Sequence, residues 1–296
     1  MVKLISDSDN CHRLAFFFCR NLSKSVEIKM EIVGYLASIL AGLSLGLIGG
    51  GGSILTVPIL VYLFSVSPVN ATEYSLFIVG ITSLIGVIPL YREKSIDFSM
   101  AVRFGIPSAL AVIFARKVIL PAIPEEIILF DSVIILRRLL IMLFFAMVMI
   151  AASLFMIFRK EKSETELINK VKNSLGLILA ESISVGTISG ISGAGGGFLI
   201  IPLLTILNKV PMKKAIGTSL LIIGVQSMIG FFAGLPAANP DWDLLLKITT
   251  LSVSGFFTGN YLSVKFSART LRNTFGWFVL CIGIYIILKE LHFLMW

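Results

Sequence analysis

The sequence predicts an all-α polytopic membrane protein built from two structural repeats, each with a glycine-broken helical hairpin and about three spanning helices. Three observations predict this fold. The 296-residue chain is 56% hydrophobic and only 14% charged, with a mean hydropathy of +0.95. Apolar stretches of about 17 to 25 residues, the length that a bilayer-crossing helix needs, recur along the chain. A glycine-rich interruption followed by a proline occurs twice, with a separation of 144 residues.

The two interruptions indicate a duplicated unit. They are Gly49–Ser53, with Pro58 five residues beyond, and Gly193–Gly197, with Pro202 five residues beyond. The same offset of 144 joins identical residues at many further positions, among them Ser38 and Ser182, Gly42 and Gly186, Ser75 and Ser219, Gly80 and Gly224, Ser83 and Ser227, Asp97 and Asp241, and Ser108 and Ser252. Glycine-interrupted apolar segments at corresponding places in two halves indicate a transporter binding site near the bilayer midplane.

The predicted division of the chain follows from the apolar runs and the polar stretches between them. Residues 1–29 form an N-terminal tail, 30–160 the first repeat (copy 1), 161–172 a polar linker and 173–291 the second repeat (copy 2). In each copy a broken segment precedes three helices. The expected segments are 31–64, 71–91, 98–118 and 137–158 in copy 1, and 175–207, 215–234, 243–264 and 271–289 in copy 2. A longer loop with Pro121 and Pro124 separates the last two helices of copy 1.

Loop charges suggest that the two copies are inserted in opposite senses. The loop 208–214 of copy 2 carries three lysines, whereas the equivalent loop 65–73 of copy 1 carries none. After the next helix the bias reverses, with Arg92 and Lys94 in copy 1 and Asp241 and Asp243 in copy 2. Positive residues mark the cytoplasmic side, so the swap predicts an inverted repeat in which each broken segment turns back as a hairpin. The alternative is a parallel arrangement in which each broken helix crosses once, giving four spans per copy.

Composition also excludes several classes of function. The net charge of +8 comes from short basic clusters at the ends of apolar runs, such as Arg137 and Arg138, which mark topology and do not form a nucleic-acid surface. Cys11, Cys19 and Cys281 have neither metal-ligand spacing nor a disulfide framework. The two histidines stand at opposite ends of the chain, outside the apolar core. We therefore expect no metal, no cofactor and no enzymatic activity.

The glycine interruption with its downstream proline, together with the stretch Lys213–Leu220, resembles the sulfite exporter TauE/SafE family of membrane permeases. The likeness covers about residues 31–290. The resemblance implies transport of sulfite, sulfonates and other small sulfur-containing anions across the cytoplasmic membrane. Copy 1 departs from the pattern, since residues 70–75 read Asn-Ala-Thr-Glu-Tyr-Ser where the family-like stretch of copy 2 reads Lys-Ala-Ile-Gly-Thr-Ser.

The broken helices themselves predict an anion site. A helix that restarts after a glycine break directs unpaired backbone N–H groups and its positive dipole end into the gap. Glycine lets an oxyanion approach the backbone, and nearby hydroxyls add donors without a full charge. The predicted substrate-binding residues are Gly50, Gly51, Gly52, Ser53, Ser75, Ser192, Gly195, Gly196, Gly197, Thr218 and Ser219. The alternatives are close helix packing, which the pairs Gly42/Gly46 and Gly186/Gly190 favour, and hydroxyls that bond back to their own helix.

Charged residues inside apolar runs have two interpretations, since each is costly in a membrane unless it is paired or solvated. Arg103 and Lys247 are related by the offset of 144. They either reach the interface with their side chains or attract an anion at opposite mouths. Glu181 lies several residues into the second broken segment, where it either carries a coupling proton or pairs with a nearby base.

The resulting functional prediction is a multi-pass permease in the cytoplasmic membrane that works by alternating access. No nucleotide-binding motif occurs, so we expect coupling to an ion or proton gradient. The expected partners are a small anionic substrate and the lipid bilayer, without nucleic acid, and a homodimer is compatible with the sequence. A channel-like pore, or a transporter for another small anion or metabolite, is the alternative.

Overall fold

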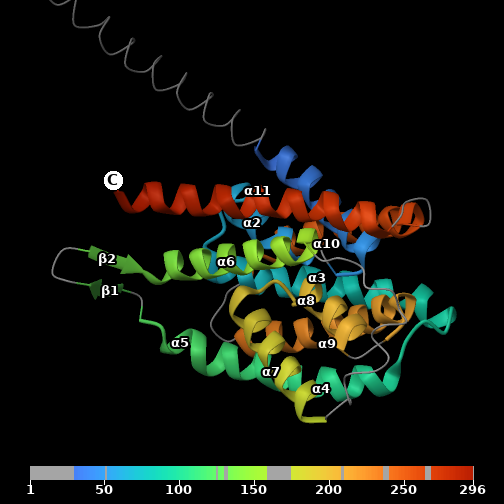
Figure 1. Ribbon diagram of the computed structural model, residues 1–296. Coiled ribbons are helices and arrows are strands. Elements are labelled where there is room, and N and C mark those ends of the chain that lie inside the picture. Colours follow the sequence, from blue (N-terminus) through green and yellow to red (C-terminus); the bar gives the residue numbers. More distant parts are fainter. Residues whose placement is uncertain are drawn as a thin grey trace, which may run out of the picture.

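The computed structural model describes residues 30–50, 52–124, 126–129, 133–158, 175–207, 210–235, 240–263 and 268–295. The predicted tail, the predicted linker 161–172 and Gly51 lie outside these residues. Figure 1 shows the long helices packed side by side, with α11 along one edge of the bundle and α4 and α7 at the opposite edge.

Copy 1 contains a helix at each predicted position. Its elements are a first helix, Met30–Ile48, then α2 (Ser53–Tyr62), α3 (Pro68–Arg92), α4 (Phe98–Phe114), a π-helical turn (Ala115–Ile119), α5 (Leu120–Ala122) and α6 (Arg137–Phe158). Local sequence explains several of the boundaries. Ser67 caps α3 by accepting a hydrogen bond from the Asn70 N–H, and Pro68 occupies the first turn, where a missing N–H costs nothing. Asp97 caps α4 in the same way through the Met100 N–H.

Copy 2 follows the same order. Its elements are α7 (Leu175–Ser192), α8 (Gly197–Pro202), a second π-helical turn (Leu203–Leu207), α9 (Met212–Gly234), α10 (Trp242–Ser263) and α11 (Ala268–Met295). Asp241 accepts a hydrogen bond from the Leu244 N–H at the start of α10, so the identical aspartates at positions 97 and 241 perform the same capping.

A small β hairpin replaces part of the predicted loop between α5 and α6. Strand β1 (Glu126–Leu129) pairs antiparallel with β2 (Val133–Leu136), and Figure 1 shows the hairpin at one end of the bundle. The sequence predicted a longer loop here and gave no sign of the hairpin within it. Both strands are rich in isoleucine or valine, and short apolar runs of this kind are ambiguous in sequence.

Within the described residues, seven helices are long and apolar enough to cross a membrane. They are Met30–Ile48, α3, the continuous span from α4 to α5, α6, α7, most of α9, and α11. On α4, large apolar side chains are exposed at every fourth position, namely Phe98, Val102, Ile106, Leu110 and Phe114. Such a stripe suits contact with lipid, and the chain is a multi-pass membrane protein.

Helix α10 is less apolar than these seven helices, although the sequence predicts it as a span. It carries several threonines and serines, and the hydroxyls of Thr249, Thr250 and Thr258 each donate to a carbonyl of their own helix four residues earlier. Such internal bonding satisfies the hydroxyl donors without water. The helix packs along α3 and against the first helix, so it belongs to the same bundle.

Contacts between the copies occur in pairs related by the offset of 144. A Cβ atom placed on Gly42 of the first helix would overlap the carbonyl of Ser252 in α10, and one on Gly186 of α7 would overlap the carbonyl of Ser108 in α4. These glycines therefore serve close helix packing, as their spacing suggested. The next glycine of each helix, Gly46 or Gly190, continues the same contact one turn later.

The same contacts give the direction of each helix. Gly80 of α3 lies against Met228 of α9, while Leu84, one turn later on α3, lies against Gly224, one turn earlier on α9. The central pair α3 and α9 therefore runs antiparallel. The contact of Gly276 with Ile157 and that of Gly283 with Ile150 show that α6 and α11 are antiparallel too. In contrast, the first helix runs parallel to α10, and α7 runs parallel to α4.

Candidate functional site

Both glycine interruptions are true breaks between helices. The first break (Gly49–Gly52) separates the first helix from α2, and the second break (Gly193–Gly197, which includes the first residue of α8) separates α7 from the rest of α8. Gly49 and Gly193 have φ angles of +76° and +70°, a left-handed conformation that side chains disfavour. Each still donates its N–H to a carbonyl four residues earlier, that of Leu45 or Ser189, so the helix ends at the glycine.

The two breaks touch in the interior of the bundle. A Cβ atom placed on Gly50 would lie 2.6 Å from the carbonyl oxygen of Gly197, and one placed on Gly197 would lie 2.6 Å from the carbonyl oxygen of Gly50. The two main chains are therefore in direct contact with no side chain between them. This conformation leaves no room for an anion between Gly50 and Gly197 themselves.

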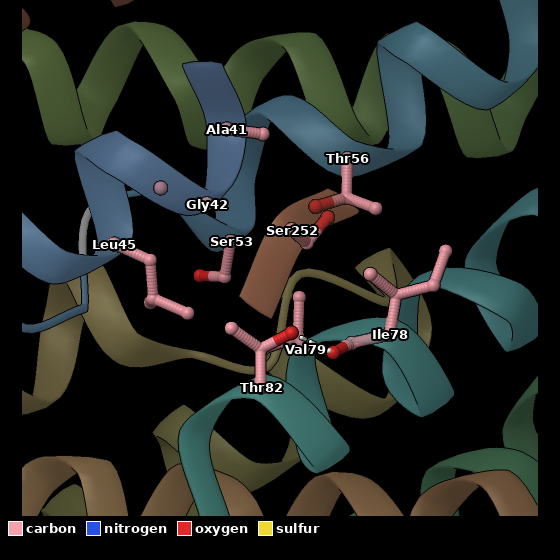
Figure 2. A pocket seen from close by; sticks show the side chains of 10 residues that line it. Ala41, Gly42, Leu45, Ser53, Thr56, Ile78, Val79, Thr82 and Ser252 are labelled. Atoms are coloured by element: carbon pink, nitrogen blue, oxygen red, sulfur yellow. Dashed lines mark hydrogen bonds between the residues drawn. The ribbon is translucent and has the colours of Figure 1, made fainter. Parts of the chain in front are cut away.

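A cavity lies beside the first break (Figure 2). The space between its lining atoms, open solvent included, is about 190 Å³, and the narrow interior has room for only about one water molecule. We call it the copy-1 cavity; its lining residues are Ala41, Gly42, Leu45, Gly52, Ser53, Thr56, Ile78, Val79, Thr82 and Ser252. Four of these carry hydroxyls on α2, α3 and α10. The Ser53 hydroxyl donates to the Gly50 carbonyl at 3.0 Å, which connects the cavity wall to the point where the breaks meet.

The equivalent space beside the second break is occupied by Gln226. This residue is the counterpart of Thr82 under the offset of 144 and is fully buried. Its side-chain amide donates to the Gly195 carbonyl at 2.6 Å and accepts from the Ser108 hydroxyl at 2.5 Å. A Cβ atom on Gly196 would lie 3.2 Å from the Gln226 amide nitrogen, so the amide fills the region that is open in copy 1.

Several buried hydroxyls on α3, α7 and α9 have no hydrogen-bond partner among the described residues. They are Ser75, Ser83, Ser189 and Ser227. The Ser227 oxygen is close to the second break, 3.0 Å from a Cβ atom placed on Gly195. A buried donor without an acceptor costs about 1–3 kcal/mol, so such groups are available to a solute that brings acceptors. Ser189 was missed by the sequence analysis, although it shares a helix face with Ser182 and Ser192.

Other predicted hydroxyls hold the framework together. Ser219 donates to the Gly49 carbonyl at 3.2 Å and to the Ile216 carbonyl at 2.9 Å, which ties α9 to the first break. Thr218 accepts from the Asp97 N–H at 2.9 Å, and Ser192 accepts from the Ala194 N–H at 3.4 Å. These bonds position the breaks and the helix start at α4.

The three predicted charged residues are not brought together. Arg103 on α4 and Lys247 on α10 are exposed, and Lys247 forms an ion pair with the exposed Asp243 one turn away. Glu181 is buried on α7, about three turns before the second break. No group of three or more His, Cys, Asp or Glu side chains within the described residues could hold a metal ion.

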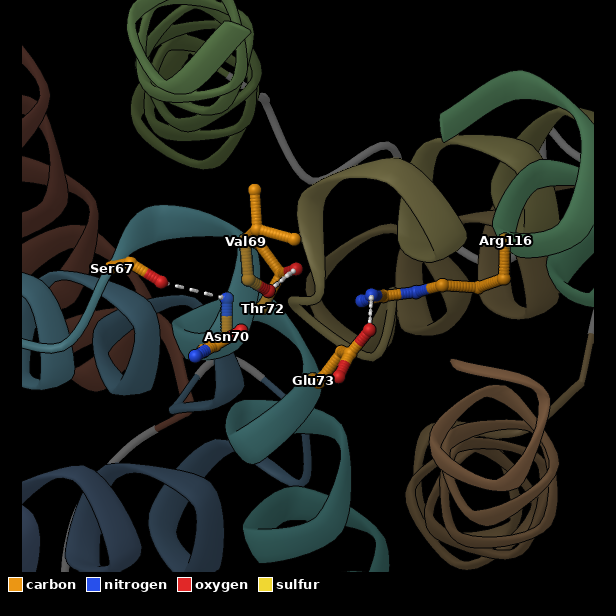
Figure 3. A network of polar contacts seen from close by, with 6 residues as sticks. All are labelled: Ser67, Val69, Asn70, Thr72, Glu73 and Arg116. Carbon is orange, nitrogen blue, oxygen red and sulfur yellow. Dashed lines mark hydrogen bonds and ion pairs between the residues drawn. The ribbon is translucent and has the colours of Figure 1, made fainter. Parts of the chain in front are cut away.

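The sequence analysis missed a buried ion pair. Arg116, in the π-helical turn after α4, lies 3.7 Å from Glu73 of α3, measured from Nη1 to Oε1 (Figure 3). The signal was present, because both are charges in apolar surroundings. It was overlooked because the helix predicted over 98–118 put Arg116 at its end and the loop predicted over 65–73 included Glu73. The helical span in fact continues to Ala122, and α3 already begins at Pro68.

Comparisons with known proteins agree with this architecture. The family model described as "Sulfite exporter TauE/SafE" matches residues 35–286. Probable membrane transporter proteins from two strains of Xylella fastidiosa are 29% and 30% identical, each alignment covering 85% of this chain and 92% of the relative. A probable membrane transporter protein of Methanocaldococcus jannaschii is 28% identical over 70% of this chain and 71% of its own length. No solved structure matches the chain.

Proposed function

Because the chain belongs to the sulfite exporter TauE/SafE family, we propose that it moves a small sulfur-containing anion, sulfite or an organosulfonate, across the cytoplasmic membrane. The broader assignment, a multi-pass membrane transporter, rests on the family match, the transporter relatives and the seven apolar helices. The identity of the anion, the assignment to the cytoplasmic membrane and the transport mechanism are proposals.

The observation that carries the proposal is the meeting of two glycine breaks beside buried hydroxyls. Gly50 and Gly197 touch in the interior, and the buried Ser227 hydroxyl on α9 lies close to Gly195. Ser83 on α3 is its counterpart under the offset of 144, and neither hydroxyl has a partner among the described residues. No side chain among the described residues caps the N-terminus of α2 at Gly52, so this helix end can add N–H donors at the wall of the copy-1 cavity. Neutral donors suit an oxyanion, since they stabilise its charge without adding a counter-ion that traps it.

The helix directions support alternating access. Helices α3 and α9 are equivalent under the offset of 144 and run antiparallel, and the last helices of the copies, α6 and α11, do so too. We infer that the copies are inserted in opposite senses, so each half can present the same site to one side of the membrane. The copy-1 cavity has room for about one water, so we infer that it must widen to admit sulfite.

Coupling to an ion or proton gradient is the remaining part of the proposal. Glu181 is a buried carboxylate in a membrane-spanning helix that leads directly to the second break. Intramembrane carboxylates commonly carry protons in transporters. Sulfite flux that follows an imposed pH gradient in the native protein, and loses that dependence in Glu181→Gln, would identify this residue as the coupling group.

The test is a flux assay with purified protein in liposomes. We expect saturable uptake of sulfite or a short sulfonate, with counterflow, and a loss of most of it in Ser83→Ala and Ser227→Ala. Ser254→Ala is the matched control, because that hydroxyl is exposed on α10 and bonds to the carbonyl of Leu251. Folded protein that shows no saturable flux of any sulfur oxyanion would refute the proposal. Flux that rises linearly with concentration and shows no counterflow would instead identify a channel-like pore.

A further inference from the structure

The ion pair of Arg116 and Glu73 lies inside the membrane-spanning part of the bundle. Arg116 is 3% exposed and Glu73 is 4% exposed. Arg116 lies six residues before the end of its helical span at Ala122, and Glu73 lies five residues after the start of α3 at Pro68. At 1.5 Å per residue both are roughly 8–9 Å inside the same end of the bundle. Charges at such depth mark solute pathways unless they are fully paired.

The two side chains of this ion pair lack most of the hydrogen bonds that their charged groups can form. At 3.7 Å the closest contact is too long for a hydrogen bond. None of the three guanidinium nitrogens of Arg116 has a hydrogen-bond partner among the described residues, and neither has the Oε2 atom of Glu73. A guanidinium group carries five N–H donors and normally engages a carboxylate through two parallel bonds. Among the described residues no acceptor forms a hydrogen bond with any of these five donors, although the group is buried.

Its surroundings place the pair beside the second break. The residue before Glu73, Thr72, lies against Gly193, where an added Cβ atom would be 2.5 Å from the Thr72 Cα. The residue before Arg116, Ala115, lies against Gly190 in the last turn of α7. Figure 3 shows the two side chains reaching toward each other from α3 and from the turn after α4. The π-helical turn that carries Arg116 is itself a feature that occurs frequently at functional sites.

We propose that Arg116 binds the permeating oxyanion at the entrance to the second break, and that Glu73 takes the anion's place when the site is empty. The inference rests on the proposed function and adds a charged subsite to its neutral one. An oxyanion with two or three oxygens can form the two parallel bonds that Glu73 does not form, so it can displace the carboxylate. Glu73 packs closely against Gly234, where an added Cβ atom would lie 2.7 Å from its Oε1 atom, so the carboxylate occupies space that only a glycine leaves.

The proposed charged subsite has no equivalent beside the first break. Under the offset of 144 the counterparts of Arg116 and Glu73 are Asn260 and Gly217, which carry no charge. The two halves would therefore meet the anion differently, with a charged entrance beside the second break and a neutral one beside the first.

The experiment measures the unfolding temperature of the full-length protein in detergent, with sulfite, sulfate or chloride added. The variants are Arg116→Gln, Glu73→Gln and the double variant Arg116→Gln/Glu73→Gln. The double variant is the matched control for folding, because it leaves no uncompensated buried charge. We expect sulfite to stabilise the native protein, to stabilise Glu73→Gln by a larger shift, and to leave both variants that lack Arg116 unshifted.

Flux in liposomes gives a second readout. We expect the concentration of sulfite at half-maximal flux to rise at least about tenfold in the double variant, since it loses charge-assisted bonds. Arg116→Lys keeps the charge without the planar fork and should lie between the double variant and the native protein. A double variant that keeps both the sulfite-induced shift and the native half-maximal concentration would overturn the charged subsite. A native protein without saturable oxyanion flux would instead overturn the function on which the inference rests.

Discussion

Beside the first break, the space next to Gly52 and Ser53 is open and has Thr82 in its wall. Beside the second break, the equivalent space next to Gly196 and Gly197 holds the side chain of Gln226. The residue at one equivalent position, Thr82 in copy 1 and Gln226 in copy 2, accounts for whether the space beside the break is open or filled. The glutamine satisfies the Gly195 carbonyl and the Ser108 hydroxyl, whereas the threonine hydroxyl donates to the Ile78 carbonyl of its own helix.

The glycine contacts between helices and the bonds at the starts of α4 and α10 show no such difference. Gly42 and Gly186 pack against the carbonyls of Ser252 and Ser108, and the N–H groups of Asp97 and Asp241 donate to the hydroxyls of Thr218 and Tyr74, all pairs related by the offset of 144. The comparison separates two roles in the sequence. Small residues fix how the helices approach in both copies, and single side chains then decide which break has empty space beside it in this conformation.

The largest expected effect concerns the shared framework. Gly42→Leu and Gly186→Leu should each lower the free energy of unfolding by about 3 kcal/mol or more, because a side chain at either site must displace a neighbouring helix backbone. Thermal unfolding and the monodisperse fraction in detergent measure this loss. Gly105→Ala is the control, since its Cβ atom would lie 3.7 Å from Ile222, an ordinary contact. Tolerance of leucine at only one of the two sites would show that the copies do not share the packing equally.

The second prediction concerns the filled break. Gln226→Thr should lower the free energy of unfolding by about 2 kcal/mol, because the Gly195 carbonyl and the Ser108 hydroxyl lose their buried partner. Chemical or thermal unfolding in detergent measures the change. Gln226→Met keeps most of the volume without the hydrogen bonds and separates the two contributions. Full recovery of stability by methionine would show that filling the space, and not bonding, is the role of the glutamine.

Much of this framework could be predicted from the sequence. The offset of 144, the glycine breaks and the apolar runs predict every long helix of the described chain, because periodicity and length are properties that each segment carries by itself. The β hairpin between α5 and α6 was not predicted, since its four-residue strands are too short for a period to decide between strand and loop.

The finer features of the site could not be predicted, for a different reason. The occupation of the second break by Gln226 and the approach of Arg116 to Glu73 depend on contacts between positions 31 and 43 residues apart. No local pattern encodes such contacts. An error of three or four residues at the helix ends was enough to put these two buried charges at the ends of the predicted helices.

The third prediction addresses the open break. Thr82→Gln should fill the copy-1 cavity and abolish most sulfite flux, while it changes the free energy of unfolding by about 1 kcal/mol. The effect on stability is smaller than for Gln226→Thr because no existing bond between helices is lost. Thr82→Ser keeps the hydroxyl that donates to the Ile78 carbonyl and is the control. Native flux in a folded Thr82→Gln variant would show that the solute does not use this cavity.

The smallest expected effect concerns the exposed pair Arg103 and Lys247, which the offset of 144 also relates. Both side chains lie at the surface, where long cationic chains reach the interface and ion pairs such as that of Lys247 with Asp243 contribute little. Arg103→Gln and Lys247→Gln should leave the unfolding temperature unchanged and the sulfite flux within about twofold of the native value. Comparison of these two variants with Arg116→Gln/Glu73→Gln distinguishes the effect of losing any positive charge from the effect of losing one buried guanidinium. A steep fall in flux in both exposed variants would mean that the surface charges of Arg103 and Lys247 attract the anion. The difference between the two breaks would then matter less for transport than these surface charges, which both copies carry.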